Sequence, residues 1–168
     1  TELPVITDLR AMDLAFGGQG APIVPMGEKY LLGDYQYFLN IGGIANISAN
    51  RTDGYIAFDI CPANRVLNML VAELGLEYDA GGEISAGGSV DQSLLAKLNA
   101  FSYYDQAYPK SLANDFGTDT IYPLIKQSGI SLPDALRTMV EHTAQQVRKS
   151  VIMILARNNE QQANGARM

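Results

Sequence analysis

Two adjacent glycines interrupt an apolar strand pattern in the segment FLNIGGIANIS, residues 38–48. Two glycines cost backbone entropy in the middle of a sheet, so something should require them there. One explanation is a tight hairpin turn, because Gly-Gly between two apolar runs is an ordinary turn signal. The other is that the bare N–H groups of Gly42 and Gly43 bind an anion such as a phosphate. These residues alone favour the plain hairpin, since glycine turns are far commoner than phosphate sites.

Asp59 is the second candidate for chemistry, in the segment FDICPAN at residues 58–64. It ends a predicted strand just ahead of a predicted helix, where a carboxylate can reach a reacting centre and still be rigidly held. The alternative is a helix cap, because Asp is a favoured N-cap residue. Taken alone, the segment favours the cap.

Other reactive side chains are expected to be structural. Cys61 near a helix N-terminus could have a lowered pKa, but a buried inert thiol is favoured. His142 is expected to be solvated rather than catalytic. The tyrosines at 103, 104 and 108 could line a sugar site, or they could anchor a loop without further function.

The composition is that of one globular domain of 168 residues. Hydrophobic residues make up 47% and charged residues 18%, as in folded soluble proteins. The net charge of −6 and the absence of a basic cluster argue against nucleic acid as a partner.

No apolar run approaches the roughly 20 residues that cross a bilayer, and no signal peptide is visible. Cys61 is the only cysteine, which excludes an internal disulfide and a cysteine-based zinc cluster. We therefore expect a cytoplasmic protein without a membrane partner and without a bound metal of its own. The chain starts at Thr1 and closes on a polar turn, so we expect both ends to be cut.

Hydrophobic patterning predicts strands in the first third of the chain. Between the first two, residues 15–25 hold too much glycine and proline for a regular element. After the last strand, Pro62 suits the first turn of a helix that Gly75 ends. The predicted strands lie at residues 3–7 and at about 35–42, 44–49 and 54–60.

The rest of the chain is predicted to be mostly helical. A glycine-rich loop at 79–88 precedes a short amphipathic helix with Asp91 in its first turn. A loop containing tyrosines follows, then a short helix at 119–127 and the longest helix at about 132–157, with Pro133 near its start. The expected fold class is α/β with a mixed-direction sheet. The apolar stripe of the long helix is expected to comprise Leu136, Met139, Val140, Val147, Val151, Ile154 and Leu155.

Four segments gain meaning when they are taken together, in this order and at this spacing. They resemble the anhydro-N-acetylmuramic acid kinases, bacterial enzymes of murein recycling, over nearly the whole chain. The resemblance implies an actin-like ATPase (ribonuclease H-like) fold, in which two α/β lobes close on ATP and each opens with a three-stranded meander. The segments are DLRAMDLAFGGQGAPIVP at 8–25, NIGGIANIS at 40–48, FDICPAN at 58–64 and YPKS at 108–111.

The resemblance implies that residues 1–168 form a single domain, an incomplete second lobe of such a kinase. Residues 1–34 would supply an interlobe strand and a glycine-rich loop, and residues 35–168 the lobe proper. Such a fragment is expected to be inactive alone, and to self-associate as a homodimer through apolar surface and an unpaired strand edge.

The implied reaction uses ATP with Mg²⁺. ATP phosphorylates O6 of 1,6-anhydro-N-acetylmuramic acid while water attacks C1 and opens the anhydro bridge, which gives N-acetylmuramic acid 6-phosphate. The resemblance makes Asp59 the base that deprotonates this water. It also places Gly42 and Gly43, with Asn46 and Asn64, against the nucleotide phosphates.

Substrate-binding roles are implied for residues in two further motifs. Arg10 and Asp13 match a D-F-R-x-x-D pattern, in which the guanidinium could grip a sugar carboxylate; an ion pair with a neighbouring aspartate is the alternative for Arg10. Gln19 belongs to the glycine-rich loop beneath the site. Lys110 and Ser111 match a P-K-S motif, although a solvated lysine is the ordinary interpretation.

Departures from the family pattern support other functions. Ile60, Cys61 and Ala63 replace a threonine and two glycines beside the carboxylate, and their side chains would crowd a phosphate loop. The arginine that usually follows P-K-S is missing, as are the first lobe and the segment that receives adenosine. The alternatives are a catalytically impaired relative that binds a sugar or a nucleotide, and a kinase for another sugar.

Overall fold

The computed structural model describes residues 7–17, 24–51 and 54–165. The chain forms two compact units. The smaller unit comprises Thr1–Phe38 with Ser48–Ala57, and the larger unit comprises Leu39–Ile47 with Phe58–Met168. Strands and helices are both present, which confirms the α/β class.

Three strands form one meander in the order β1-β2-β3, as predicted. They are β1 (Tyr37–Ile41), β2 (Ile44–Arg51) and β3 (Gly54–Pro62). Two-residue connections join antiparallel strands only, so the mixed direction expected from the sequence is not found among the described strands. Pro62 ends β3 and does not start a helix; at the end of an edge strand its missing N–H costs no ladder bond.

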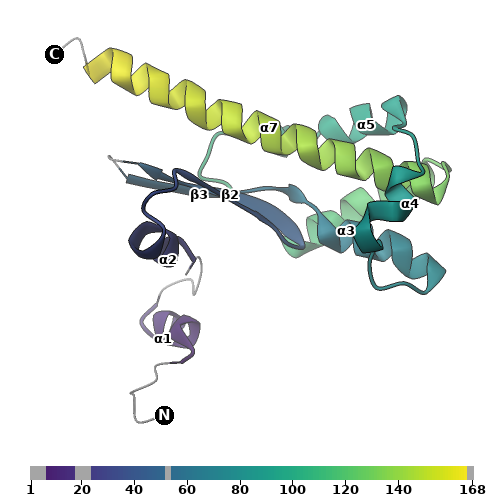
Figure 1. Ribbon diagram of the computed structural model, residues 1–168, viewed down its shortest axis with the longest axis horizontal. Coiled ribbons are helices and arrows are strands. Elements are labelled where there is room, and N and C mark those ends of the chain that lie inside the picture. Colours follow the sequence, from purple (N-terminus) through teal and green to yellow (C-terminus); the bar gives the residue numbers. More distant parts are fainter. Residues whose placement is uncertain (1–6, 18–23, 52–53, 166–168) are drawn as a thin grey trace. The chain divides into compact units, whose positions relative to one another are not determined.

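Helices make up the rest of the larger unit (Figure 1). Short 3-10 helices occur at Ala72–Leu74, Ala80–Gly82 and Ser102–Asp105, and a π-helical segment at Phe116–Ile121 precedes α6. Gly75 has a φ of 74° and ends the first helical stretch, as predicted. The α-helices are α3 (Asn64–Val71), α4 (Glu83–Ala86), α5 (Gln92–Asn99), α6 (Tyr122–Gln127) and α7 (Leu132–Gly165).

Two aspartates explain where α4 and α5 begin. The Asp79 carboxylate accepts hydrogen bonds from the N–H groups of Ile84 (2.9 Å) and Ser85 (3.0 Å). Residues 79–88, predicted to be a loop, therefore contain a short helix. Asp91 is the N-cap of α5 and accepts from Leu94 N–H at 2.7 Å, one position before the predicted first turn.

The core of the larger unit lies where α7 packs against α3, α4 and α5 (Figure 1). The predicted apolar stripe of α7 is partly wrong, because Val140 (37% exposed) and Leu155 (46% exposed) face outward. Polar side chains occupy the middle of the buried face instead, including Thr138, His142 and Gln146. The core residues are Val66, Leu70, Val71, Leu94, Leu98, Ile121, Ile125, Ala135, Leu136 and Met139.

Two helices of the smaller unit were not predicted: α1 (Leu9–Ala15) and α2 (Val24–Leu31). The strand predicted at residues 3–7 falls almost entirely outside the described part of the chain. A carboxylate of α2 fastens this helix to the strands, since Glu28 accepts hydrogen bonds from the hydroxyls of Ser48 (2.5 Å) and Tyr55.

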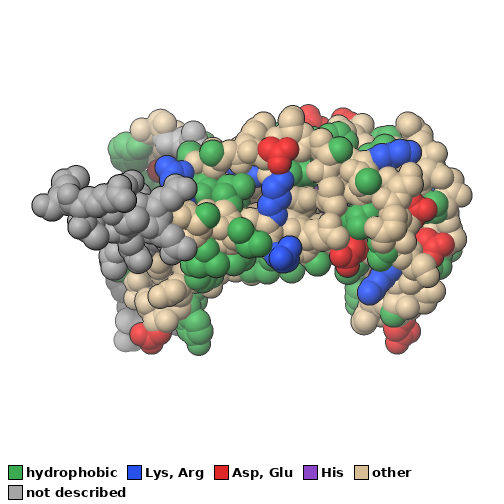
Figure 2. Space-filling model, turned by 90° about the horizontal axis from the view of Figure 1, so that it is seen from above, with side chains coloured by type: hydrophobic (Ala, Val, Ile, Leu, Met, Phe, Trp, Pro, Cys, Tyr) green, Lys and Arg blue, Asp and Glu red, His purple; other side chains and the backbone are tan. Residues whose placement is uncertain are grey.

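The surface over α7 mixes apolar and charged side chains. Lys and Arg side chains lie apart from one another on the face in Figure 2. Ile152 and Leu155 of α7 are about half exposed, at 49% and 46%. Among the described residues, no helix is long and apolar enough to cross a membrane.

Candidate active site

The turn between β1 and β2 is fastened to the start of α3. The Gly42 carbonyl accepts a hydrogen bond from Asn64 N–H at 3.0 Å. The Gly43 carbonyl accepts from Ala63 N–H at 2.9 Å, and the Ile41 carbonyl accepts from the Asn64 side-chain amide at 2.9 Å. These carbonyls satisfy N–H groups at the helix start, which otherwise need a cap. The predicted hairpin is thus confirmed.

The two glycines present their N–H groups on the side away from α3. In a planar trans peptide, the carbonyl and the N–H of the next residue point in opposite directions. Because the carbonyls of Ile41 and Gly42 face α3, the N–H groups of Gly42 and Gly43 face away from it. An anion at this turn would therefore meet glycine N–H groups and not the α3 N-terminus.

Neither conformation nor internal packing explains the glycine pair. Neither glycine has a positive φ, so this is not a hairpin turn that requires one. An added Cβ would meet no described atom closer than 3.5 Å at Gly42 or 3.6 Å at Gly43, which are ordinary contact distances. A Cβ at either position would therefore fit the described structure, and the binding of an anion by these N–H groups stays a prediction.

Asp59 lies inside β3 and is held by residues 103–112. Its N–H donates to the Lys110 carbonyl (3.2 Å), and its carbonyl accepts from the Tyr103 hydroxyl (2.7 Å). Carboxylate Oδ2 accepts from Leu112 N–H at 2.9 Å. Oδ1 receives no hydrogen bond from the described residues. One carboxylate oxygen is thus fixed and the other is open to a ligand.

The helix-cap alternative for Asp59 is wrong. Helix α3 begins at Asn64, its N-cap is Ala63, and no side chain caps it. The carbonyls of the glycine turn cap the helix instead. The preference for Asp just before a helix therefore gave a wrong prediction here.

The Lys110 side chain folds back onto the segment that carries it. Its Nζ donates to the Tyr103 carbonyl at 3.1 Å. The ammonium also lies 4.7 Å from the Tyr103 ring centroid and 5.8 Å from that of Phe58. Burial, followed by the charge of Lys149, lowers the pKa of Lys110. The prediction that Lys110 is a solvated lysine is therefore wrong.

The predicted site residues are divided between the two units. Arg10 and Asp13 are exposed, three positions apart on α1 of the smaller unit. Gln19 lies outside the described residues. In the larger unit, Asn46 is half-buried in β2 and Ser111 is exposed beside the lysine. The predicted residues of the larger unit are Gly42, Gly43, Asn46, Asp59, Asn64, Lys110 and Ser111.

Comparison with known proteins identifies the family. The family model of anhydro-N-acetylmuramic acid kinase matches residues 1–164. The chain belongs to the anhydro-N-acetylmuramic acid kinase family.

Curated relatives carry the same family name. The chain is 38% identical over 158 residues to an anhydro-N-acetylmuramic acid kinase of Rhizobium rhizogenes, with 89% of this chain and 41% of the relative covered. The relative from Cupriavidus pinatubonensis is 38% identical over 163 residues, with 89% and 42% covered. That from Shewanella sp. strain MR-4 is 41% identical over 122 residues, with 68% and 33% covered. The chain thus spans about two fifths of the length of the first two relatives.

The replaced residues beside Asp59 are buried. Ile60 (1% exposed), Cys61 (0%) and Ala63 (0%) belong to the core, and the first two lie in β3. That they would crowd a phosphate stays a prediction. Cys61 is buried, as predicted, and this burial raises the pKa of its thiol to about 12.

The prediction that His142 is solvated is wrong. This residue is fully buried, with Nδ1 2.7 Å from Asn99 Oδ1 and Nε2 3.2 Å from the Tyr104 hydroxyl. Thr138, His142 and Gln146 share one helix face at a spacing of four residues, which was the available signal. Tyr103 and Tyr104 are buried anchors, as one alternative for the tyrosines proposed.

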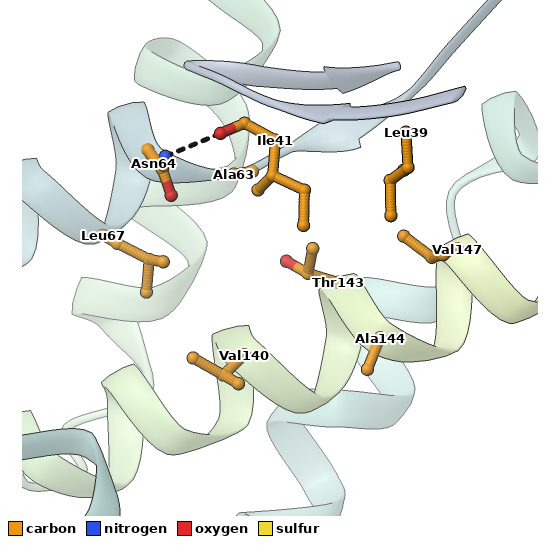
Figure 3. Close-up of a pocket in the computed structure, with 9 residues that line it drawn as sticks. All are labelled: Leu39, Ile41, Ala63, Asn64, Leu67, Val140, Thr143, Ala144 and Val147. Carbon is orange, nitrogen blue, oxygen red and sulfur yellow. Dashed lines mark hydrogen bonds between the residues drawn. The ribbon is translucent and has the colours of Figure 1, made fainter. Parts of the chain in front are cut away.

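A pocket of about 380 Å³ lies between β1, the start of α3 and α7 (Figure 3). Leu39 and Ile41 of β1 point toward Val147 and Thr143 of α7 (Figure 3). Apolar side chains dominate the lining, so the pocket suits apolar groups more than a phosphorylated sugar. The nine lining residues are Leu39, Ile41, Ala63, Asn64, Leu67, Val140, Thr143, Ala144 and Val147.

Proposed function

We propose that this chain forms part of a kinase that phosphorylates O6 of 1,6-anhydro-N-acetylmuramic acid and opens its anhydro bridge with water. The product is N-acetylmuramic acid 6-phosphate, an intermediate in the recycling of cell-wall amino sugars. The observation that carries this proposal is Asp59, fixed through one carboxylate oxygen in a chain of this family.

Asp59 acts in this proposal as the general base. Its backbone is bound at both the N–H and the carbonyl, which holds the residue in its place in β3. Leu112 N–H orients the carboxylate through Oδ2, which leaves Oδ1 to take the proton of the water that attacks C1.

The glycine turn contacts the nucleotide phosphates in this proposal. The N–H groups of Gly42 and Gly43 bind phosphate oxygens on the side away from α3, and Asn46 follows them in β2. Asn64 does not contribute in this proposal, because its side-chain amide donates to the Ile41 carbonyl on the α3 side. ATP, when bound, supplies the transferred phosphoryl group. Among the described residues, no group of three acidic, histidine or cysteine side chains could hold a metal. We therefore assign Mg²⁺ to the phosphates of ATP, as kinases commonly hold it.

Sugar binding is assigned to Arg10, Asp13, Gln19 and Ser111. The exposed guanidinium of Arg10 can bind the lactyl carboxylate of the sugar through two parallel N–H bonds. The β1-β2-β3 meander followed by helices fits an actin-like second lobe. Residues 1–34 would lie next to the interlobe boundary, and residues 35–168 would form the lobe proper. Such an enzyme would work in the cytoplasm, where ATP is available.

The test uses the protein that contains this chain at the length of its relatives, called the full-length protein below. It is incubated with ATP, Mg²⁺ and 1,6-anhydro-N-acetylmuramic acid, and the products are identified by mass spectrometry and ³¹P NMR. We expect equal amounts of ADP and N-acetylmuramic acid 6-phosphate. Nucleotide binding without any product would favour the impaired binding protein, and turnover only with another sugar would favour the third alternative.

A further inference from the structure

Lys110 closes residues 103–110 into a loop. Its backbone carbonyl accepts from Asp59 N–H (3.2 Å), while its ammonium donates to the Tyr103 carbonyl (3.1 Å), seven residues earlier. The ammonium also lies against the rings of Tyr103 and Phe58. Lys110 therefore joins the two ends of the loop to each other and to β3. A cation against aromatic faces in a half-buried place contributes more than it would in water.

The residues directly after this loop supply the group that orients the carboxylate. Leu112, two residues after the lysine, donates its N–H to Asp59 Oδ2 at 2.9 Å. Phe58, next to Asp59 in β3, stacks on Tyr108 with ring centroids 5.2 Å apart and planes within 4°. The segment is thus bound to β3 on both sides of the lysine.

We infer that Lys110 is a positioning residue for Asp59 and not a ligand of the sugar. The ammonium fixes the loop, the loop places Leu112 N–H, and this N–H holds Oδ2 so that Oδ1 faces the reacting water. The inference rests on the proposed role of Asp59 as base, and it replaces the substrate-binding role that the P-K-S motif suggested.

The ammonium makes its contacts within the chain in this geometry. One of its three N–H donors is bonded to the Tyr103 carbonyl, and the charge lies against two aromatic rings. Removing the charge but keeping the stem should therefore loosen the loop, whereas a guanidinium should keep much of its order.

The experiment compares Lys110→Met and Lys110→Arg with a matched control, Lys126→Met. Lys126 of α6 makes an exposed ion pair with Glu73 at 2.7 Å and belongs neither to the loop nor to the site. The first readout is hydrogen exchange of the Leu112 amide, measured by NMR in the 168-residue chain. The second is kcat and KM for sugar and ATP in the full-length protein.

We expect Lys110→Met to speed Leu112 exchange at least about 10-fold and to lower kcat about 10- to 100-fold, because small displacements of a catalytic group cost that much. Both KM values should stay within about twofold. Lys110→Arg should restore most of the protection and of kcat, and Lys126→Met should change neither.

Two results would overturn the inference. One is unchanged Leu112 exchange in Lys110→Met. The other is a raised KM for the sugar with kcat unchanged, which is the signature of a sugar ligand. A wild-type protein without sugar-kinase activity would refute the proposed function instead, and the Leu112 exchange would still decide whether Lys110 holds the loop.

Discussion

His142 has hydrogen-bond partners that define its protonation state. Asn99 Oδ1 also accepts from the Gln146 side-chain amide at 2.7 Å, so this oxygen is an acceptor and His142 Nδ1 carries the hydrogen. Nε2 is then the acceptor for the Tyr104 hydroxyl. The ring is therefore neutral, and burial lowers the pKa of His142 from 6.5 to about 4.

Stability should depend on pH through this single histidine of the chain. Its pKa is lower in the folded than in the unfolded state, so the unfolded state binds more protons below pH 6.5. The stabilisation is complete above about pH 6.5 and is lost as the pH falls toward 4. We expect the free energy of unfolding to drop by about 2 kcal/mol between pH 7 and pH 5, measured by urea titration.

The control is His142→Gln, which cannot titrate. Its free energy of unfolding should be lower than that of the wild type at pH 7, but nearly the same at pH 7 and pH 5. A wild-type protein equally stable at the two pH values would contradict the assignment of a neutral, buried ring.

At the scale of elements, the segment after α4 touches the start of α7 at its backbone. A Cβ at Gly88 would lie 2.1 Å from the Pro133 carbonyl oxygen, so only glycine fits this contact. Next to it, Ser89 N–H donates to the Asp134 carboxylate at 2.7 Å. The contact fixes where α7 starts relative to α4.

Gly88→Ala should destabilise the chain by about 3 kcal/mol, because backbone on both sides must move. The matched control is Gly87→Ala: Gly87 has a φ of −78°, and its added Cβ would meet nothing closer than 3.5 Å. The control should change the free energy of unfolding by less than about 0.5 kcal/mol. Urea titration of both variants is the measurement, and equal stabilities would show that α4 and α7 do not approach this closely.

Elements with a strong local pattern could be predicted from the sequence. Alternating apolar residues identified β1 and β2, and the periodic run that Gly75 ends identified α3. The extension of β3 through Pro62 had no local signal, because proline suits the first turn of a helix equally well. The buried face of α7 was predicted wrongly at Val140 and Thr138. The Thr138 hydroxyl donates to the Asp134 carbonyl of its own helix and accepts from Asp91 N–H. A hydroxyl with such partners can be buried as readily as a valine.

The candidate site shows the same limit. Asp59 could be found as a residue of interest, but its partner Leu112 lies 53 positions away, and no short-range rule connects them. His142 was misplaced for the same reason, since its ring partners Asn99 and Tyr104 lie 43 and 38 positions away. Short-range sequence patterns identify candidate residues, whereas hydrogen bonds between distant parts of the chain determine the role of each residue.

At the scale of the whole molecule, β1 is an edge of the described sheet. An edge strand leaves N–H and C=O groups without ladder partners and can pair with another chain. Leu39 and Ile41 of β1 are 47% and 48% exposed, and both line the pocket beside α7. This edge offers a second copy both backbone pairing and apolar surface.

We expect the 168-residue chain to form a homodimer through β1 at micromolar concentration. The net charge of −6 opposes this weakly once salt screens it. Light scattering across a dilution series should show a mass above 18.2 kDa. Ile41→Lys should return the chain to a monomer, while Leu76→Lys, at an equally exposed site (45%), should not. A monomer mass at all concentrations would contradict this prediction.

Asp59→Asn in the full-length protein is the most direct test of the role of Asp59 as the general base. Asparagine is nearly isosteric and its oxygen can still accept from Leu112 N–H, but it cannot take the water's proton. We predict that the rate of sugar opening falls on the order of 10² to 10⁴-fold while ATP affinity stays nearly unchanged. Asp115→Asn, at an exposed position, should keep full activity. An Asp59→Asn protein that opens the sugar at the wild-type rate would contradict the claim.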